Sequence, residues 1–359
     1  DLVKDAEADL VVFDEELSPA QGKNLEELIG VRVMDRSELI LDIFGTRARS
    51  REARMQVELA QLQYLLPRLS RMWKHLSRIR GGIGLRGPGE TQLETDRRLI
   101  GTRIGDLRRK LKVVAKARAV QRQGREGSFK VSLVGYTNAG KSSLLRALSG
   151  SDILVENRLF ATLDSATRSV DLGSGLEALM TDTVGFIRKL PHDLVASFRS
   201  TLEEAQEADV LLHVIDASHS DWEEQRAVVL QVLHDLDLEK REKILVFNKV
   251  DQITHEEEAA LSVRIRSLDP TPAVFVSAHD LDTLEALRET LRARVRGRMA
   301  SVIVTIPVSD GETIATVYRE GEVTSRTEER MEIVLTAKVP RGLVGRLSGR
   351  SGIVVEEMA

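Results

Sequence analysis

The first stretch of the chain has the hydrophobic pattern of a small α/β unit. Apolar runs at 10–13 and 31–35 are flanked by polar residues and predict two buried strands. Between them, Ser18 followed by Pro19 is typical of a helix start, because serine caps free N–H groups and proline fits the first helical turn. We therefore expect an N-terminal α/β domain over residues 1–46.

The hydrophobic period then changes to that of paired helices. From 62 to 79, and again from 100 to 114, apolar side chains recur at alternating intervals of three and four residues, which is the spacing of a helix–helix seam. Residues 78–90 contain five glycines and a proline, and such a stretch does not sustain a helix. Pro67 lies inside the first seam and should kink or split that helix. We predict a long antiparallel helical hairpin with a glycine-rich tip over residues 47–126.

From residue 130 onward, short apolar runs alternate with longer amphipathic stretches. This alternation is typical of a doubly wound, mostly parallel sheet with helices on both faces. We expect an α/β domain of this kind over residues 127–299. Its strand candidates are 130–134, 179–181, 210–216, 244–247 and 273–276.

The pattern changes once more near residue 298. Apolar and β-branched residues gather in three runs, at 302–308, 315–321 and 331–339. We interpret all three as strands of a small, separate C-terminal α+β domain over residues 300–359.

Composition excludes several kinds of protein. Apolar residues make up 42 % of the chain and charged residues 30 %, which allows a sizeable core. The sequence has no cysteine, so it forms no disulfide or zinc–thiolate site, which fits a reducing cytoplasm. No apolar run approaches the ~20 residues of a membrane span and no signal peptide opens the chain, so we expect no stable membrane insertion. The first residue is Asp1, and we expect the natural chain to begin earlier.

The net charge of −4 conceals a strong asymmetry. Between Phe44 and Arg125 there are 21 basic and 6 acidic residues, whereas the rest of the chain has 31 basic and 50 acidic residues. A basic segment attached to an acidic body suggests a polyanionic partner. A solvated helical surface and a nucleic-acid interface explain this excess equally well, and both interpretations stay open at this point.

The run from Gly135 to Ser142 fits a phosphate-binding loop. It reads GYTNAGKS and lies between a predicted strand and a predicted helix, where backbone N–H groups and a helix N-terminus face a phosphate. Lys141 would reach the β- and γ-phosphates, and Ser142 would give a hydroxyl to Mg²⁺. The nucleotide-binding candidates of this loop are Gly135, Tyr136, Thr137, Asn138, Ala139, Gly140, Lys141, Ser142 and Ser143.

A second motif predicts the choice of base. Asn248, Lys249 and Asp251 follow an apolar strand candidate. A carboxylate at that position can accept two hydrogen bonds from guanine, whereas adenine would leave it unpaired, which is a strong form of discrimination. Ser277 and Ala278 end the next strand candidate, where the Ala278 N–H would face the guanine O6. We therefore expect GTP and GDP as ligands.

A third motif, Asp182-Thr183-Val184-Gly185, follows another strand candidate. Asp182 would hold Mg²⁺ through water, and the Gly185 N–H would sense the γ-phosphate. Thr162 lies between the phosphate loop and Asp182 and would supply a second hydroxyl to Mg²⁺, although it can also be an ordinary loop threonine. The order of these motifs is that of GTPases. The catalytic candidates are Lys141, Thr162 and Gly185, and the metal candidates are Ser142, Thr162 and Asp182.

Phe186 occupies the position where many GTPases have a glutamine that orients the attacking water. A phenyl ring cannot hydrogen-bond to water, so the sequence predicts slow hydrolysis by the protein alone. The structural alternative is that Phe186 packs at the edge of the sheet.

Three further stretches carry a family resemblance. They are RGPGETQLETDRR at 86–98, DTVGFI at 182–187 and LLHVIDAS at 211–218. Together with the GTPase motifs, they resemble the HflX family of translational GTPases, in the Obg–HflX group, over nearly the whole chain. The stretch at 86–98 is the most diagnostic, because it lies outside the GTPase core.

The resemblance implies a function that neither spacing nor composition gives. It implies binding to the large (50S) ribosomal subunit and its rRNA, and nucleotide-dependent splitting of stalled or idle ribosomes, with hydrolysis stimulated by ribosomes. We expect a cytoplasmic monomer that does not bind DNA. A GTP-timed factor in large-subunit assembly, and a coiled-coil adaptor with a vestigial site, are the alternatives. The candidates for RNA contact are Arg80, Arg86, Arg97 and Arg98.

Overall fold

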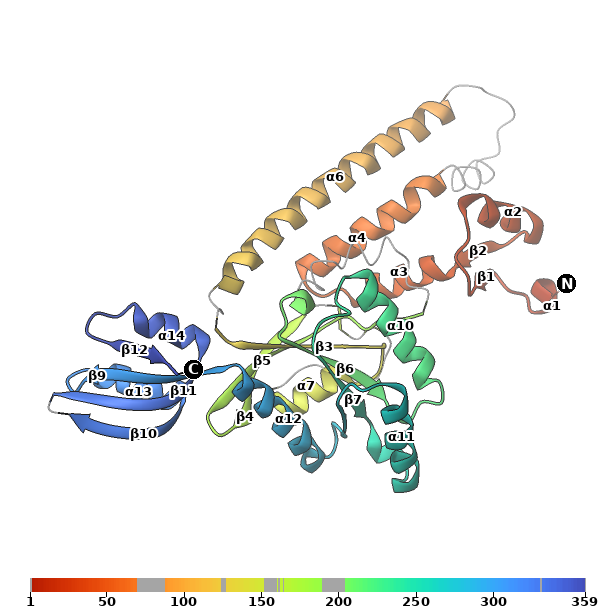
Figure 1. Ribbon diagram of the computed structural model, residues 1–359. Helices are drawn as coiled ribbons and strands as arrows, with labels where there is room; N and C mark the ends of the chain where they lie inside the picture. Colours follow the sequence, from red (N-terminus) through yellow and green to blue (C-terminus); the bar gives the residue numbers. More distant parts are fainter. Residues whose placement is uncertain are drawn as a thin grey trace. The chain divides into compact units, whose positions relative to one another are not determined.

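The computed structural model of the protein contains two compact units. One comprises Asp1–Ala119 with Arg188–Leu202, and the other comprises Val120–Ile187 with Glu203–Ala359. Figure 1 labels their helices and strands. The structure describes residues 2–69, 88–123, 127–151, 160, 162–163, 165–188, 204–329 and 331–358.

The first unit begins with two parallel strands and three helices. Their order is α1 (Leu2–Asp5), β1 (Leu10–Phe13), α2 (Pro19–Ile29), β2 (Arg32–Asp35) and α3 (Arg36–Arg47), with β1 beside β2. The predicted helix start is confirmed, since the Ser18 hydroxyl accepts the Gln21 N–H and the Gln21 side chain accepts the Ser18 N–H. The helix ends at Gly30, whose φ is 84°.

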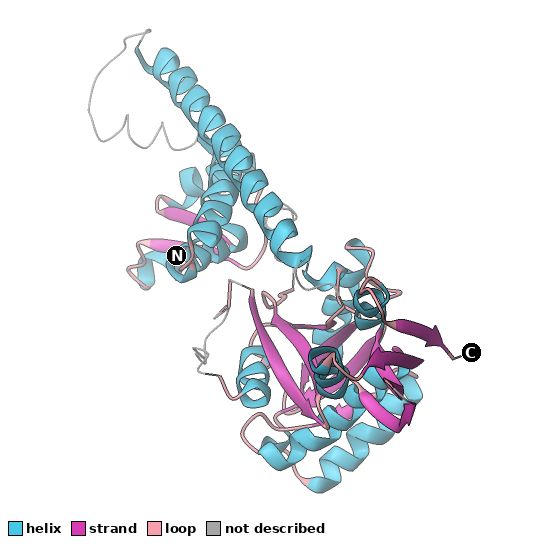
Figure 2. Ribbon diagram, turned by 90° about the vertical axis from the view of Figure 1, so that its left-hand side faces the viewer, coloured by secondary structure: helices cyan, strands magenta, loops and turns pink. Residues whose placement is uncertain are grey.

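The predicted antiparallel pair of helices is confirmed for the described residues. Helix α4 (Arg51–Leu65) ends before Pro67, which lies in the 3-10 turn η1 (Leu66–Arg68), so the proline does end this helix. The partner is the 36-residue helix α6 (Pro88–Gln123), the long helix in Figure 2. Leu59, Ile104 and Leu107 are buried between the two. The predicted tip at 78–90 lies outside the described residues except for its last three positions, which begin α6.

The second unit contains the predicted mostly parallel sheet. Its six strands have the order β4-β5-β3-β6-β7-β8, and only the edge strand β4 is antiparallel to its neighbour. The strands are β3 (Phe129–Gly135), β4 (Ala166–Gly173), β5 (Leu176–Asp182), β6 (Val210–Asp216), β7 (Lys243–Asn248) and β8 (Ala273–Phe275). The sequence prediction missed β4.

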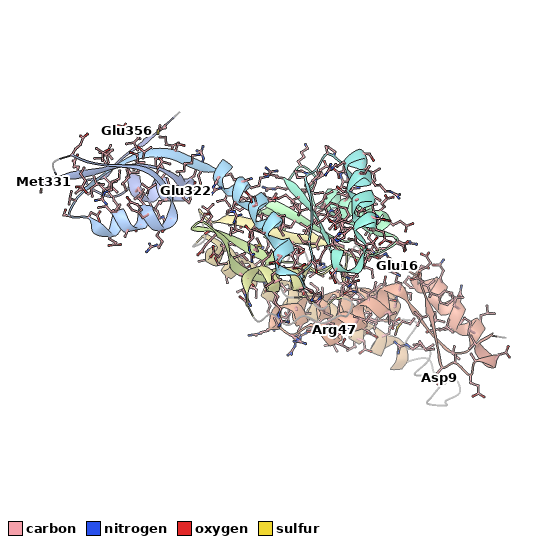
Figure 3. The ribbon with its side chains drawn as sticks, turned by 90° about the horizontal axis from the view of Figure 1, so that it is seen from below. Asp9, Glu16, Arg47, Glu322, Met331 and Glu356 are labelled. Atoms are coloured by element: carbon pink, nitrogen blue, oxygen red, sulfur yellow. The ribbon has the colours of Figure 1, made fainter. Side chains whose placement is uncertain are left out.

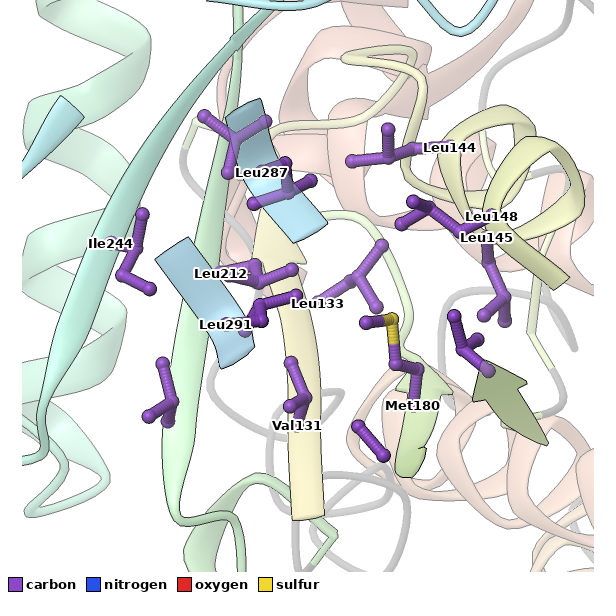
Figure 4. Close-up of a cluster of buried hydrophobic side chains, with 14 of the residues drawn as sticks. Val131, Leu133, Leu144, Leu145, Leu148, Met180, Leu212, Ile244, Leu287 and Leu291 are labelled. Atoms are coloured by element: carbon purple, nitrogen blue, oxygen red, sulfur yellow. The ribbon is translucent and has the colours of Figure 1, made fainter. Parts of the chain in front are cut away.

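Helices cover both faces of this sheet, as the doubly wound pattern predicts. Helices α7 (Lys141–Ser149) and α12 (Leu284–Gly297) bury their leucines in one core, where Leu144, Leu145, Leu287 and Leu291 surround Leu133 (Figure 4). On the other face, α10 (Trp222–Asp235) and α11 (His255–Leu268) form a second core. The short turns η2 (Val250–Gln252) and η3 (Leu281–Thr283) complete this part.

The C-terminal elements form a four-stranded antiparallel sheet with two helices. Their order is β9 (Met299–Pro307), α13 (Gly311–Glu320), β10 (Glu322–Glu329), β11 (Glu332–Pro340), α14 (Arg341–Ser348) and β12 (Val354–Glu357), and the strand order is β10-β11-β9-β12. This is the split βαβ arrangement. Met331 lies in the turn between β10 and β11, at the far end of that hairpin from Glu322 (Figure 3).

One predicted strand is wrong. Residues 315–321 lie mostly in helix α13 rather than in a strand. The Asp310 carboxylate caps this helix by accepting the Thr313 N–H, and Thr313 and Val317, four residues apart, are both fully buried. Burial at helical spacing therefore overrides the β-propensity of valine, threonine and tyrosine here.

Candidate nucleotide site

The phosphate-binding candidates lie in the turn between β3 and α7. Gly135 ends the strand and Lys141 begins the helix. A Cβ on Gly135 would lie 2.3 Å from the Val214 carbonyl oxygen, and one on Gly140 would lie 2.2 Å from the Asn248 side-chain nitrogen. The backbone of β6 therefore excludes a side chain at Gly135. At Gly140 a side chain would displace the Asn248 amide and strain a backbone whose φ is 91°. This is a second reason for glycine besides close approach to a phosphate.

Lys141 is buried and turned toward the loop. Its Nζ donates to the Gly135 carbonyl oxygen at 3.2 Å and to the Tyr136 carbonyl oxygen at 2.9 Å. Burial lowers the pKa of Lys141 to about 8, and the Asp182 carboxylate opposes this shift. The ammonium group is thus desolvated and held among backbone oxygens, where an anionic phosphate would stabilise its charged form.

Three oxygen-bearing side chains from separate segments converge beside the loop. The Ser142 Oγ lies 2.6 Å from the Thr162 Oγ1 and donates to the Asp182 Oδ2 at 2.5 Å. Asp182 is fully buried, and burial raises its pKa while Lys141 lowers it. The Asp182 Oδ1 has no hydrogen-bond partner in the part of the chain that the structure describes. Thr162 therefore lies beside Ser142 in this cluster, and its role as a metal ligand stays a prediction.

The segment after Asp182 is joined to the phosphate loop by its backbone. The Thr137 N–H donates to the Phe186 carbonyl oxygen at 2.7 Å, and the Phe186 N–H donates to the Gly135 carbonyl oxygen at 3.0 Å. Phe186 is only 2 % exposed, so its side chain is packed in the protein, in agreement with the structural alternative given for this residue. At Gly185, a Cβ would lie 2.8 Å from the Thr137 Cα. Thr183 and Val184 are buried.

Asn248 connects the base-recognition candidates to the phosphate loop. Its side-chain nitrogen donates to the Ala139 carbonyl oxygen at 3.0 Å, and its side-chain oxygen accepts the Ala278 N–H at 3.1 Å. Nearby, the Ser277 hydroxyl donates to the Asp251 Oδ1 at 2.6 Å. The two motifs that the sequence places at neighbouring strand ends thus form one hydrogen-bonded group.

Asp216 is a residue of this group to which sequence reasoning gave no role. Its Oδ2 accepts a hydrogen bond from the Lys249 Nζ at 2.5 Å, and its Oδ1 accepts the Ser218 N–H at 3.0 Å. Lys249 itself has a left-handed backbone with φ of 68°. Asp216 ends β6 opposite Asn248 in β7. The sequence did contain a signal for Asp216, since it is a charged residue at the end of a buried strand.

The RNA-contact candidates divide into two groups. Arg80 and Arg86 lie outside the described residues. Arg97 and Arg98 are exposed on α6. No helix in the described part of the chain is long and apolar enough to span a membrane.

Three family models match consecutive parts of the chain. A model described as the N-terminal region of GTP-binding GTPases matches residues 1–45, and one described as their middle region matches residues 47–125. A model described as a 50S ribosome-binding GTPase matches residues 130–249.

Several relatives are similar over most of their length. GTPase HflX of Magnetococcus marinus is 44 % identical over 99 % of this chain and 82 % of the relative. GTPase HflX of Escherichia coli K12 is 44 % identical over 94 % of this chain and 79 % of the relative. Among solved structures, a GTP-binding protein from Sulfolobus solfataricus in complex with GDP is 26 % identical, with a TM-score of 0.45, and covers 80 % of this chain and 81 % of that one.

Proposed function

Because this chain belongs to the HflX family of GTPases, we propose that it binds the large ribosomal subunit and separates ribosomes into subunits. Binding and hydrolysis of GTP follow from family membership. The observation that carries the proposal is the match of residues 130–249 to a 50S ribosome-binding GTPase, in a chain whose residues 44–125 are strongly basic. We propose the four domains at 1–46, 47–126, 127–299 and 300–359, in a cytoplasmic monomer.

The site residues have separate roles in this proposal. The phosphate loop and Lys141 hold the phosphates, and Asp251 with Ser277 and Ala278 holds the guanine base. The oxygen donors of Ser142, Thr162 and Asp182 suit Mg²⁺, which prefers oxygen ligands, and the unpartnered Asp182 Oδ1 is free to hold a water bound to the metal. When bound, Mg²⁺ would supply positive charge that offsets the negative charge of the phosphates. Phe186 cannot orient water, so hydrolysis by the protein alone is slow.

The exposed face of α6 supports an RNA contact. Two arginines of α6 are used between the helices, since Arg103 pairs with Glu58 and Arg118 pairs with Glu52. Other cations of α6 are exposed and have no ion pair within the described ranges: Arg97, Arg98, Arg108, Lys112 and Lys116. Free cations aligned on one helix suit a phosphate backbone, which binds them without sequence preference.

The test is the separation of purified 70S ribosomes, followed by light scattering and sucrose gradients. With a GTP analogue we expect the protein to lower the scattering as subunits separate, and with GDP we expect little change. Lys141→Ala should be inactive, because its nucleotide binding is lost. Intact 70S particles at saturating protein would contradict the proposal, and binding confined to immature large subunits would favour the assembly factor instead.

A charge-reversal variant tests the surface. Arg97→Glu combined with Arg98→Glu should weaken binding to large subunits while GTP binding is retained. The matched control is Arg341→Glu, at an exposed arginine of α14. Equal binding by both variants would show that this face of α6 does not contact RNA.

A further inference from the structure

Two segments that carry site residues meet at one residue of the phosphate loop, Thr137. Its backbone N–H donates to the Phe186 carbonyl oxygen at 2.7 Å. Its side-chain Oγ1 accepts the Phe160 N–H at 3.1 Å. Thr137 is only 7 % exposed, so both hydrogen bonds are shielded from water. One residue thus contacts the segment that follows Gly185 and the segment that precedes Thr162.

The two contacts depend differently on the side chain. The link to Phe186 uses only main-chain atoms, and together with the bond from the Phe186 N–H to the Gly135 carbonyl oxygen it forms a short parallel bridge. Any residue at position 137 can make this link. The link to Phe160, in contrast, requires a hydroxyl or another acceptor on the side chain.

The Phe160 backbone needs such a contact. Its φ is 55° and its side chain is 2 % exposed. A left-handed backbone is unfavourable for a bulky residue and persists only when its surroundings hold it. Phe160 is two residues before Thr162, whose Oγ1 lies 2.6 Å from the Ser142 Oγ. Fixing the Phe160 N–H therefore restricts where the Thr162 hydroxyl can lie.

We propose that the Thr137 hydroxyl is a positioning group that sets the preference of this site for GTP with Mg²⁺ over GDP. By holding Phe160, it keeps Thr162 beside Ser142, so that less conformational entropy is lost when Thr162 binds the metal with GTP. GDP lacks the γ-phosphate, so its affinity should depend less on the position of the Thr162 hydroxyl. The proposal concerns the GTPase site alone and stands whether or not the protein separates ribosomes.

The test compares Thr137→Val, which keeps the shape and removes the acceptor, with Thr137→Ser, which keeps the hydroxyl. The measurement is the affinity for a non-hydrolysable GTP analogue and for GDP, titrated with fluorescent nucleotides over a range of Mg²⁺ concentrations. For Thr137→Val we expect the ratio of GTP-analogue to GDP affinity to fall about tenfold, because a buried N–H loses its partner. The Mg²⁺ concentration for half-maximal binding of the analogue should rise. Thr137→Ser should restore both values.

The control is Thr313→Val, which removes another buried hydroxyl, one that donates to Asp310 in the C-terminal sheet domain. It should lower stability without changing the affinity ratio. An unchanged ratio in Thr137→Val, or an equal loss of both affinities, would overturn the proposal. If Thr137→Val does not fold, hydrogen exchange of the Phe160 amide in the wild-type protein tests the hydrogen bond instead. We expect protection in the GTP-analogue complex, and rapid exchange there would exclude the hydrogen bond.

Discussion

At the scale of single residues, Asp251 offers the sharpest prediction about the ligand. Its Oδ1 accepts a hydrogen bond from the Ser277 hydroxyl, which orients the carboxylate that we propose binds the guanine base. Asp251→Asn places an amide donor opposite the guanine N1–H and amine, so guanine affinity should fall by roughly a thousandfold. Xanthine nucleotides, whose 2-oxo group accepts from an amide, should then bind better than guanine nucleotides. Titration with both nucleotides measures this, and unchanged guanine selectivity would contradict the assignment.

His213 predicts a dependence of stability on pH. It is 1 % exposed in β6, neither ring nitrogen has a hydrogen-bond partner in the described structure, and burial lowers its pKa to about 3. Below pH 6.5 the unfolded chain binds a proton that the native protein does not. The free energy of unfolding therefore decreases as the pH is lowered from 6.5 to about 3. From pH 7 to pH 5 this group removes about 2 kcal/mol of the free energy of unfolding. The charges that also act on it are Arg226, Lys243, Asp269 and Lys141.

The variant His213→Leu isolates this contribution. Urea unfolding at pH 5 and pH 7 can be followed by Trp222 fluorescence in a Trp73→Phe background, since Trp222 is packed in the core beside β6. The difference in stability between the two pH values should be about 2 kcal/mol smaller in the variant. An identical pH dependence in both proteins would show that His213 is protonated in the native state or does not titrate in this range.

The convergence of Ser142, Thr162 and Asp182 could be predicted because the phosphate loop, the threonine and the aspartate follow one another in the order found in GTPases, where all three serve one Mg²⁺. The pairing of Asp216 with Lys249 could not. It depends on β6 lying beside β7 with Asp216 opposite Asn248, and a hydrophobic run does not reveal the register between two strands. For the same reason, the contacts that exclude a Cβ at Gly135 and Gly140 appear only in the folded chain.

At the scale of elements, burial explains which strands and helices could be predicted from the sequence and which could not. The central strands β3, β6 and β7 are almost wholly buried and were visible as apolar runs. The edge strand β4 alternates weakly, with Ala166, Thr167, Arg168 and Ser169 all partly or fully exposed, so it gave no apolar signal. Helix α13 was misread because Val317 lies in a run of β-formers, although an Asp310 cap precedes it.

Helix α6 predicts a gain in stability from two substitutions. Gly101 and Gly105 lie inside the helix, and a Cβ at either position meets no atom within 4 Å. Alanine there should stabilise the helix by about 1 kcal/mol per site, since glycine has the lower helix propensity. Gly30 also has open space, but its φ is 84°, so Gly30→Ala should destabilise the same unit by about 1 kcal/mol. Urea unfolding followed by circular dichroism compares the stabilities of the three alanine variants. A lower stability of Gly105→Ala would mean that the glycine has a contact in solution.

At the scale of the whole molecule, the buried Phe186 predicts how hydrolysis depends on the partner. Phe186 is 2 % exposed, and a phenyl ring has no group that can orient an attacking water by a hydrogen bond. We expect slow turnover by the protein alone and an increase of at least about a hundredfold with large ribosomal subunits, if the partner supplies a group that orients the water. Phosphate release with and without subunits measures this. A fast basal rate that subunits leave unchanged would show that the chain positions water by itself.

The separation of charge along the chain predicts that ribosome binding is sensitive to salt. Residues 44–125 hold 21 basic and 6 acidic residues, while the remainder is acidic. In the proposed complex, attraction to RNA phosphates would therefore come from residues 44–125, and the acidic remainder would be repelled. Each phosphate contact adds about 0.7–0.9 to the slope of log affinity against log salt. Replacing Arg97 and Arg98 by alanine should therefore reduce that slope by about 1.4–1.8 if each contacts one phosphate. Sedimentation binding at several KCl concentrations gives the slope. A lower affinity with the wild-type slope would mean that these arginines act through shape or packing rather than through phosphate contacts.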